Sequence, residues 1–272
     1  MAIDVSIIIT TKNEEEHITH CLESIQAQAY PQERLEVIVV DNHSTDGTVD
    51  LARTYTPQVY TYGPERSAQR NYGIIEKACG TYAMYIDADM ILSPQVVAAC
   101  MSTMTSNPHL VGLYISEVVM GDSFWSRVRR FERSFYDGTV IDCMRFFRRV
   151  TGIATGGFDI GLTGPEDWDF DKKLRQRGET ALIPEPIYHN EAHFSFRKYV
   201  SKKKYYAKSF SAYIEKWGAD DADVKKQFGV SYRFIGVFTE RQKWRKVIAH
   251  PILTLGMYIL RFSVGVSYLL SS

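Results

Sequence analysis

Three mainly apolar runs constrain the fold of this chain more than any other feature. Residues 3–9 and 35–40 are rich in β-branched side chains, and residues 82–86 form a shorter run. Strands that are apolar along most of their length are typical of parallel sheets covered by helices on both faces. The stretches between the runs have helical periodicity, as in residues 67–78. We therefore expect an α/β fold with an open sheet flanked by helices.

Polar residues follow each of these runs, and ligands bind beyond the carboxyl ends of the strands in open α/β sheets. The residues concerned are Thr10, Thr11, Asn13 and Glu14 after the first run, Asp41 after the second, and Asp87 and Asp89 after the third. We expect these side chains to meet at one edge of the sheet. A structural role is the alternative for the first group, because Asn13 with Glu16 three residues later also fits the N-cap of a helix.

Asp87 and Asp89 are separated by one alanine immediately after a strand. Two carboxylates at this spacing suit a hard divalent cation, Mn or Mg, that also binds a diphosphate. Such a cation neutralises the charge that builds on the diphosphate as it leaves, a contribution of several kcal/mol. A solvated turn is the alternative, because Asp is common where a strand ends.

Glu166 and Asp167 stand at the start of a helical pattern that ends near Gly178. The helix dipole favours an ionised carboxylate in the first turn, and a general base has to be ionised to accept a proton. The alternative is ordinary capping, which favours acidic residues at helix N-termini in proteins of any function.

Six motifs follow one another in a fixed order over roughly residues 3–190. They are Ser-Ile-Ile-Ile-Thr-Thr-Lys-Asn-Glu-Glu at 6–15, Val-Val-Asp-Asn-His-Ser-Thr-Asp-Gly-Thr at 39–48, Ala-Gln-Arg-Asn-Tyr-Gly at 68–73, Asp-Ala-Asp at 87–89, Gly-Gly-Phe-Asp at 156–159 and Glu-Asp-Trp-Asp at 166–169. In this order and spacing the chain closely resembles the family 2 glycosyltransferases of GT-A fold. The resemblance implies a Rossmann-like open mixed sheet and an enzyme that transfers a sugar from a nucleoside diphosphate with inversion of configuration.

The resemblance also implies roles for the residues at the strand ends. In that family the positions of Thr10, Thr11, Asn13 and Glu14 hold the base and ribose, that of Asp41 binds the base, that of Arg70 contacts the nucleotide, and those of Asp87 and Asp89 bind ribose and metal. This chain has Asp41-Asn42-His43-Ser44 where the family commonly has Asp-Asp-Gly-Ser. The departure leaves the base open, so the expected donor is a UDP- or GDP-sugar. A surface ion pair is the alternative for Arg70.

The same resemblance makes Asp167 the general base, with Glu166 beside it, for attack by the acceptor hydroxyl opposite the leaving diphosphate. It also implies a histidine near the metal or the donor phosphates after the last strand, and His189 fits this position better than His193. Neutral imidazole is a suitable ligand beside carboxylates, so the expected metal set is Asp87, Asp89 and His189. A hydrogen-bonded structural histidine is the alternative.

Two segments outside the predicted strands combine cations with aromatic residues. Residues 124–135 have the pattern of an amphipathic helix, and residues 192–214 hold six cations and no acidic residue. We expect them to contact the phosphate of a lipid-linked acceptor, a polyprenyl or dolichyl phosphate or saccharide, and the head groups of a membrane. A solvated helix face or an aromatic core is the alternative.

Residues 251–270 are apolar apart from Arg261 and a few small polar residues. The run is long enough to span a bilayer, but an arginine near its middle costs about 2.5–3.5 kcal/mol on insertion. We expect an anchor that lies in the membrane plane or re-enters it; a buried helix or a dimer contact is the alternative. The expected domains are 1–190, with the nucleotide side at about 1–115 and the acceptor side at about 116–190, and a helical extension at 191–272.

Composition narrows the function and the compartment. Balanced charge, with 32 basic and 32 acidic residues, argues against nucleic-acid binding. Four scattered cysteines and an N-terminus unlike a signal peptide fit the cytoplasmic face of a membrane. The chain lacks the Gln-x-x-Arg-Trp motif of processive relatives, so we expect one sugar to be transferred per encounter.

Three rival functions stay open at this point. One is a transferase that acts on a soluble or cell-surface polysaccharide, and another is a non-catalytic nucleotide-sugar scaffold. A nucleotidyltransferase is the third, but it needs a glycine-rich loop after the first strand, where this chain has Thr-Thr-Lys-Asn-Glu-Glu.

Overall fold

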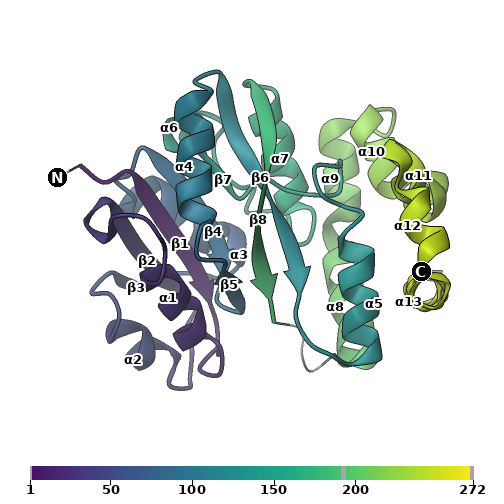
Figure 1. Cartoon of the computed structure of the whole chain (residues 1–272), viewed down its shortest axis with the longest axis horizontal. Helices are drawn as coiled ribbons and strands as arrows, with labels where there is room; N and C mark the ends of the chain where they lie inside the picture. The colour runs from purple at the N-terminus through teal and green to yellow at the C-terminus, as the bar shows by residue number, and fades with distance from the viewer. Residues whose placement is uncertain (1, 191–193, 270–272) are drawn as a thin grey trace. The chain divides into compact units, whose positions relative to one another are not determined.

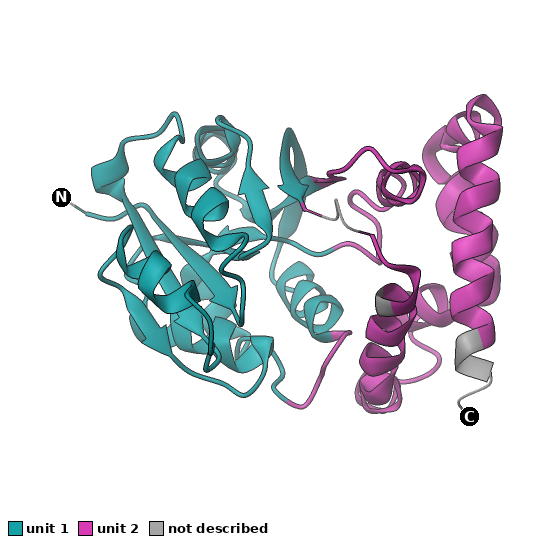
Figure 2. Cartoon of the chain, turned by 90° about the horizontal axis from the view of Figure 1, so that it is seen from below, with its two compact units in different colours: residues 1–116, 143–160, 166–189 teal, residues 117–142, 161–165, 190–272 magenta. Residues whose placement is uncertain are grey.

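The computed structural model describes residues 2–190 and 194–269 of the chain, which form two compact units (Figure 2). Unit 1 consists of residues 1–116, 143–160 and 166–189, and unit 2 consists of residues 117–142, 161–165 and 190–272. The chain therefore enters unit 2 twice before residue 190. The expected domain boundary at 190/191 stays a prediction.

An 8-stranded mixed sheet forms the centre of unit 1 (Figure 1). Its strands are β1 (Val5–Thr11), β2 (Leu35–Asp41), β3 (Val59–Thr61), β4 (Tyr82–Asp87), β5 (Met90–Leu92), β6 (Leu110–Val119), β7 (Phe146–Arg148) and β8 (Glu179–His189). They lie in the order β3-β2-β1-β4-β7-β6-β8-β5. β1 is parallel to β2 and β4, and β2 is parallel to β3, whereas β7 is antiparallel to β4 and β6, and β5 to β8. The expected open α/β sheet is confirmed.

The three predicted strands are the parallel strands β1, β2 and β4, and both faces of the sheet are covered. All seven residues of β1 are buried. Ile7 and Ile9 belong to one apolar cluster with Leu22 of α1 (Ile18–Gln26). Ile8 belongs to a second cluster with Phe170 of α7 (Glu166–Arg175). Successive side chains of a strand point to opposite faces, so a strand buried on both faces has to be apolar at nearly every position.

Helices connect the strands of unit 1. The remaining elements are η1 (Gln32–Arg34), α2 (Thr48–Arg53), α3 (Arg66–Asn71), η2 (Tyr72–Lys77), α4 (Val96–Ser106) and α6 (Arg149–Ala154). The helix predicted at 67–78 is confirmed, since α3 continues directly into η2, which is a π-helix. It carries Arg70 in its first half.

The predicted capping role of Asn13 is wrong. α1 begins only at Ile18, and Asn13 lies in the left-handed region with φ 54°. Its side-chain oxygen accepts a hydrogen bond from the N–H of Thr45 at 2.8 Å, and its own N–H donates to Oγ of Ser44 at 2.7 Å. Asn adopts this backbone conformation more readily than most residues. Asn13 therefore joins the loop after β1 to the loop after β2 instead of beginning a helix.

Unit 2 is built mainly from helices. They are α5 (Phe124–Arg133), α8 (Phe196–Tyr206), η3 (Ala207–Ser209), α9 (Phe210–Trp217), α10 (Ala222–Phe228), η4 (Tyr232–Gly236), α11 (Val237–Thr239), η5 (Glu240–Gln242), α12 (Trp244–Ala249) and α13 (Pro251–Leu269). The amphipathic helix predicted at 124–135 is confirmed as α5. Ser123 caps it by accepting a hydrogen bond from the N–H of Ser126.

The apolar segment predicted at 251–270 forms α13 as far as Leu269, and residue 270 lies outside the described residues. Arg261 on this helix is buried, and its Nη1 lies 2.6 Å from both Oε1 of Glu132 and the hydroxyl of Tyr136. It therefore faces the interior of unit 2. Within residues 2–190 and 194–269, no helix combines the length and the apolar character needed to cross a membrane.

Candidate active site

The ends of the parallel strands bring the predicted donor-binding residues together. In the sheet register Thr10 lies opposite Asp87, and Thr11 lies opposite Asp41. Oγ1 of Thr10 donates to Oδ1 of Asp87 at 3.0 Å. Four polar residues from three separate motifs are therefore neighbours at the carboxyl edge of the sheet.

Asp87 is held by arginines of α3. Nη2 of Arg70 lies 3.0 Å from its Oδ1, and Nη1 of Arg66 lies 3.8 Å from its Oδ2. Burial opposes the ionisation of Asp87, but the positive charges of Arg70, Arg66 and Arg145 outweigh it and hold the pKa of this carboxyl well below its usual range. Asp87 is therefore a carboxylate anion at neutral pH.

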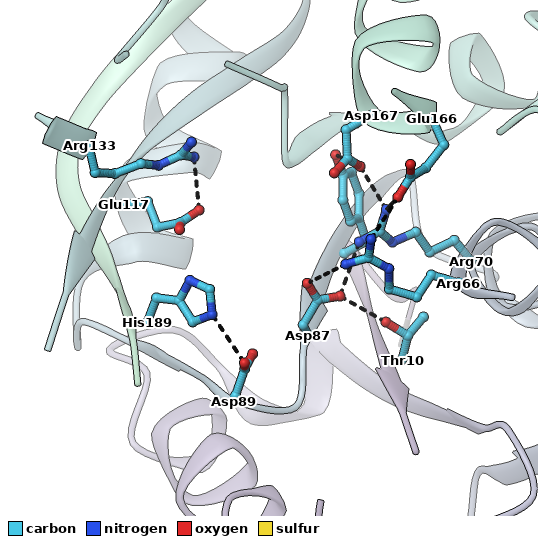
Figure 3. Close-up of polar contacts among 11 residues, drawn as sticks. Thr10, Arg66, Arg70, Asp87, Asp89, Glu117, Arg133, Glu166, Asp167 and His189 are labelled. Carbon is cyan, nitrogen blue, oxygen red and sulfur yellow. Dashed lines mark hydrogen bonds and ion pairs between the residues drawn. The ribbon is translucent and has the colours of Figure 1, made fainter. Parts of the chain in front are cut away.

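Arg70 links the end of β4 to the start of α7 (Figure 3). Its side chain is fully buried, and its Nη1 lies 2.7 Å from Oδ1 of Asp167. The guanidinium also lies 4.5 Å from the ring centre of Tyr85 and 5.1 Å from that of Phe158. Burial opposes the charge of Arg70, but Asp167 and Asp87 outweigh it and raise its pKa. The surface ion pair considered for Arg70 is therefore wrong, and its expected contact with the nucleotide stays a prediction.

Glu166 and Asp167 lie in the first turn of α7, as predicted, but in different surroundings. The side chain of Glu166 is 2% exposed and accepts from Nη2 of Arg66 at 3.0 Å, whereas that of Asp167 is 23% exposed. Burial, and then the charge of Asp167, raise the pKa of Glu166, although Arg66 opposes this. Asp167 also accepts from the hydroxyl of Tyr85 at 3.3 Å. Of the two carboxylates, that of Asp167 is the more exposed.

Asp89 and His189 form a second pair beside the first cluster. β5 and β8 are antiparallel, with Met90 opposite His189. Nε2 of His189 therefore reaches Oδ2 of Asp89 at 3.0 Å. Figure 3 shows that Asp87 is directed towards Arg66 and Arg70, whereas Asp89 is directed towards His189. The two carboxylates of the Asp-Ala-Asp motif thus have different partners.

The pair of Asp89 and His189 fits a divalent cation. Oδ1 of Asp89 is buried and has no hydrogen-bond partner among residues 2–190 and 194–269, so one oxygen of the carboxylate is available as a ligand. Across the same residues no group of three or more His, Cys, Asp or Glu side chains is arranged for a metal. Mg typically takes one or two carboxylates and completes its shell with water and substrate phosphates. A cation held by these two side chains would take its remaining ligands from water and from substrate phosphates.

The remaining predicted residues shape the loops around the strand ends. Asp41 is buried and accepts from the N–H of Ser44 at 2.9 Å and from its hydroxyl. The N–H of Glu14 donates to Oγ1 of Thr48 at 2.8 Å. Oγ1 of Thr11 is buried without a hydrogen-bond partner in the described chain. An unsatisfied buried hydroxyl is costly, so Thr11 is suited to a ligand that enters this edge.

Two residues of the site were missed by the sequence reasoning, although the sequence carried a signal for each. Arg66 precedes Arg70 by four residues, and side chains at this spacing lie on one face of a helix. Tyr85 precedes Asp87 by two residues, and such side chains share one face of a strand. His193, the weaker histidine candidate, lies outside the described residues.

Curated proteins with similar sequences are named as glycosyltransferases. A poly(ribitol-phosphate) beta-glucosyltransferase of Bacillus spizizenii is 35% identical over 95 residues, which are 31% of this chain and 14% of that protein. A dolichyl N-acetyl-alpha-D-glucosaminyl phosphate 3-beta-D-2,3-diacetamido-2,3-dideoxy-beta-D-glucuronosyltransferase of Methanococcus voltae is 49% identical over 49 residues, which are 18% of this chain and 15% of that protein. The matches thus span only a small part of these relatives.

Solved structures share the fold across nearly the whole chain. The mannosyltransferase PcManGT of Pyrobaculum calidifontis, in complex with GDP-Man and Mn2+, superposes with a TM-score of 0.64 at 20% identity. The superposition covers 98% of this chain and 85% of that one. The GT-A fold implied by the motifs is therefore confirmed.

The family model described as Glycosyl transferase family 2 matches residues 6–162. This range contains the motifs at the ends of β1, β2 and β4 and extends over more than half of the chain. The chain belongs to glycosyl transferase family 2.

Proposed function

We propose that this protein transfers one sugar, with inversion of configuration, from a UDP- or GDP-sugar to a hydroxyl of a phosphate-bearing, lipid-linked acceptor, in a metal-dependent reaction. The observation that carries the proposal is the placement of a partly exposed carboxylate, Asp167, beside the carboxyl edge of a GT-A sheet. Arg70 joins this carboxylate to Asp87, the acid that ends β4. The base and the donor-binding edge are thus connected through one side chain.

The nucleotide is proposed to bind at the edge formed by β1, β2 and β4. Thr11 offers a buried hydroxyl without a hydrogen-bond partner in the described chain, and Asp41 offers a buried carboxylate. Asn13 and Glu14 fix the adjoining loops through Thr45 and Thr48. Open α/β sheets bind their ligands at this edge.

Asp89 and His189 are proposed to hold Mn or Mg together with the donor diphosphate. When bound, the cation supplies Lewis-acid stabilisation of the leaving diphosphate. The pair supplies one carboxylate oxygen, a ligand type that suits Mn and Mg, and one imidazole nitrogen. The Mn2+ in the PcManGT complex supports a metal in a protein of this fold.

Asp167 is proposed to act as the general base. Arg70 and Tyr85 both contact its Oδ1, so they orient the carboxylate by one oxygen and leave Oδ2 for the acceptor hydroxyl. As the proton moves to Asp167, the hydroxyl oxygen forms a bond to the anomeric carbon and the diphosphate leaves from the opposite side. A single displacement of this kind inverts the configuration.

The acceptor is proposed to carry a phosphate. The names of the two curated relatives contain poly(ribitol-phosphate) and dolichyl N-acetyl-alpha-D-glucosaminyl phosphate, which have a phosphate in common. α8 presents the exposed cations Lys202 and Lys204, and cations attract a phosphate ester. The lipid-linked form is favoured by the apolar surface of α13, and the polymer form is the second candidate because of the poly(ribitol-phosphate) relative.

A donor panel with two acceptors tests the proposal. Purified protein with Mn or Mg would receive UDP- and GDP-sugars in turn, with either a polyprenyl-phosphate mixture or poly(ribitol phosphate). Mass spectrometry reads the released nucleotide and the product, and NMR of the anomeric proton reads the configuration. A metal-dependent glycolipid of inverted configuration is the expected result.

The other outcomes each overturn a named part of the proposal. A glycosylated polymer without glycolipid replaces the lipid acceptor by the second candidate. Retained configuration removes Asp167 from the role of base in a single displacement. Donor binding by calorimetry without any transfer favours the non-catalytic nucleotide-sugar scaffold, and absence of both transfer and donor binding overturns the proposed donor site.

A further inference from the structure

One face of α13 is apolar and exposed. Ile252, Leu255, Ile259, Phe262 and Val266 are between 46% and 72% exposed, and we call these five side chains the α13 stripe. They are spaced by three or four residues, so they lie along one side of the helix. At a rise of about 1.5 Å per residue, the stripe is about 21 Å long. Apolar side chains scattered singly on a surface need no explanation, but a continuous row does.

The opposite face of the same helix is fixed inside unit 2. Gly256, Met257, Leu260 and Arg261 are its inward residues. The side chains of Met257, Leu260 and Arg261 are buried, and a Cβ at Gly256 would lie 2.7 Å from Cγ2 of Val128 on α5. α13 is therefore packed closely on α5 and cannot turn its stripe inward without breaking this packing.

A buried ion pair holds α13 in this rotation. Glu132 accepts from Nη1 of Arg261 at 2.6 Å and from Nη1 of Arg129 at 2.7 Å. A buried ion that loses its partner is strongly unfavourable. Arg261 thus lies on the face of α13 away from the stripe. Its charge disfavours a helix that spans the membrane, but it does not oppose contact of the stripe with a membrane surface.

The segment just before the stripe carries exposed positive charge. Residues 241–249 contain four Lys or Arg residues and no acidic residue, and one of the four, Lys243, pairs with Glu240. Arg245 and Lys246 on α12 are exposed, and Trp244 and Ile248 add exposed apolar surface beside them. The guanidinium of Arg245 lies 5.7 Å from the ring centre of Trp244. Apolar and aromatic side chains next to cations are the composition of helices that lie in the interface of an anionic bilayer.

We propose that the α13 stripe is a membrane-contact face that lies in the plane of an anionic lipid surface, with Arg245 and Lys246 at the head groups. The inference deepens the proposed function, on which it rests for its purpose, by naming the surface on which a lipid-linked acceptor is met. A second copy of this chain would bring the same cations and no acidic residue from this segment, so an anionic surface is the better complement.

Vesicle flotation of the full chain tests the proposal without donor, metal or acceptor, so its result is independent of transfer. The variant L255E/I259E places two charges in the stripe, and V150E/L182E changes two exposed apolar residues of unit 1 in the same way. We expect the wild type and V150E/L182E to float with phosphatidylcholine–phosphatidylglycerol vesicles. The L255E/I259E variant should partition about a hundredfold less, because each large aliphatic side chain withdrawn from lipid changes the equilibrium by at least about tenfold.

Lipid composition separates the two parts of the contact. The wild type should bind pure phosphatidylcholine vesicles more weakly than phosphatidylcholine–phosphatidylglycerol vesicles. The expected difference in affinity is about fivefold for each cation that contacts the anionic head groups. The variant R245Q/K246Q should bind the two vesicle types more equally than the wild type does, and it should keep the binding that depends on the stripe. Equal binding of the wild type and L255E/I259E overturns the proposal, and so does a wild type that stays with the unbound fraction for both vesicle types.

A second variant and a second measurement guard against misfolding and against the rival occupant. I252S/I259S removes apolar surface without adding charge, and circular dichroism checks that both stripe variants keep the helical content of the wild type. Analytical ultracentrifugation without vesicles reads self-association. A wild-type dimer that L255E/I259E converts to a monomer would make the stripe a contact between copies and overturn the membrane assignment.

Discussion

Nη1 of Arg70 lies 2.7 Å from Oδ1 of Asp167, so the proposed base on α7 is bound to an arginine of α3 whose side chain is fully buried. The same guanidinium reaches Oδ1 of Asp87 through Nη2 at 3.0 Å. A buried arginine needs its partners, because an unpaired charge inside a protein is strongly unfavourable. The two carboxylates of the site therefore depend on one side chain for their position and their charge.

Replacement of Arg70 by methionine should lower the free energy of unfolding by about 3–5 kcal/mol at pH 7, the usual loss when one partner of a buried ion pair is removed. Urea denaturation followed by circular dichroism measures it. Arg53→Met is the matched control, because Arg53 forms only an exposed pair with Asp50, worth less than about 1 kcal/mol. Equal stability of wild type and Arg70→Met would contradict the structural role.

The loss caused by Arg70→Met should also depend on pH. The folded pKa of Asp87 is well below its usual range, so its pairing contributes stability above the unfolded pKa of about 3.9 and loses it as the pH falls towards the folded value. The stability difference between wild type and variant should therefore be largest near neutral pH and shrink below about pH 4. Urea midpoints of wild type and Arg70→Met, measured near pH 7 and below about pH 4, test this. A stability difference that is the same at the two pH values would mean that the ionised Asp87 does not cause it.

Asp167→Asn should bind the donor as the wild type does but lower the rate of transfer by about 10²–10⁴-fold, the usual contribution of a general base. The amide keeps the volume of the side chain and removes its ability to accept a proton. Calorimetric donor binding and turnover, measured on the same preparation, separate the two effects. Asp50→Asn on α2 is the matched control. Turnover within a few-fold of the wild type would assign the base to another residue.

Asp89→Asn and His189→Gln should each weaken the Mn-dependent part of donor binding and slow transfer by about a hundredfold or more, since a Lewis-acid contribution of several kcal/mol is lost. Calorimetry with Mn and with EDTA isolates the metal-dependent part. His109→Gln is the control, because His109 is an exposed histidine of unit 1. If Asp87→Asn alone abolished Mn binding, the cation would belong to Asp87 instead.

The three parallel strands β1, β2 and β4 were predictable because burial on both faces favours apolar residues along most of a strand. Residues of β1, β2 and β4 follow this pattern, and the parallel register then brings Thr10 and Asp87 together without further information. The meeting of Asp89 and His189 was predictable only from the family resemblance. It depends on the pairing of β5 with β8, two strands that are far apart in the sequence.

Features set by tertiary contacts escaped prediction. A helix-capping pattern begins at Asn13, but the chain uses this side chain to join two loops, because local pattern does not reveal a partner at Thr45. In the sequence, Arg261 interrupts an apolar run. Hydropathy along the sequence does not reveal which face of a helix a residue lies on, and in the structure Arg261 is buried whereas the stripe is exposed.

Glu132 on α5 should contribute more to the stability of unit 2 than either arginine that it binds. Burial opposes its ionisation, but Arg129 and Arg261 outweigh this and lower the pKa of Glu132 to about 2. Glu132→Gln leaves both cations without their acid, whereas Arg261→Met leaves Glu132 paired with Arg129 at 2.7 Å. We therefore expect the larger loss, about 3–5 kcal/mol at pH 7, for Glu132→Gln.

The pH dependence of this pair has a definite sign. Because the folded pKa of Glu132 is lowered to about 2, its stabilising contribution is present above the unfolded pKa of about 4.3 and is lost as the pH falls through about 2. Urea midpoints of the wild type should therefore approach those of Glu132→Gln in acid. Glu215→Gln, at an exposed site on α9, is the matched control. A larger loss for Arg261→Met than for Glu132→Gln would mean that packing around the arginine, and not the shared carboxylate, holds α13 on α5.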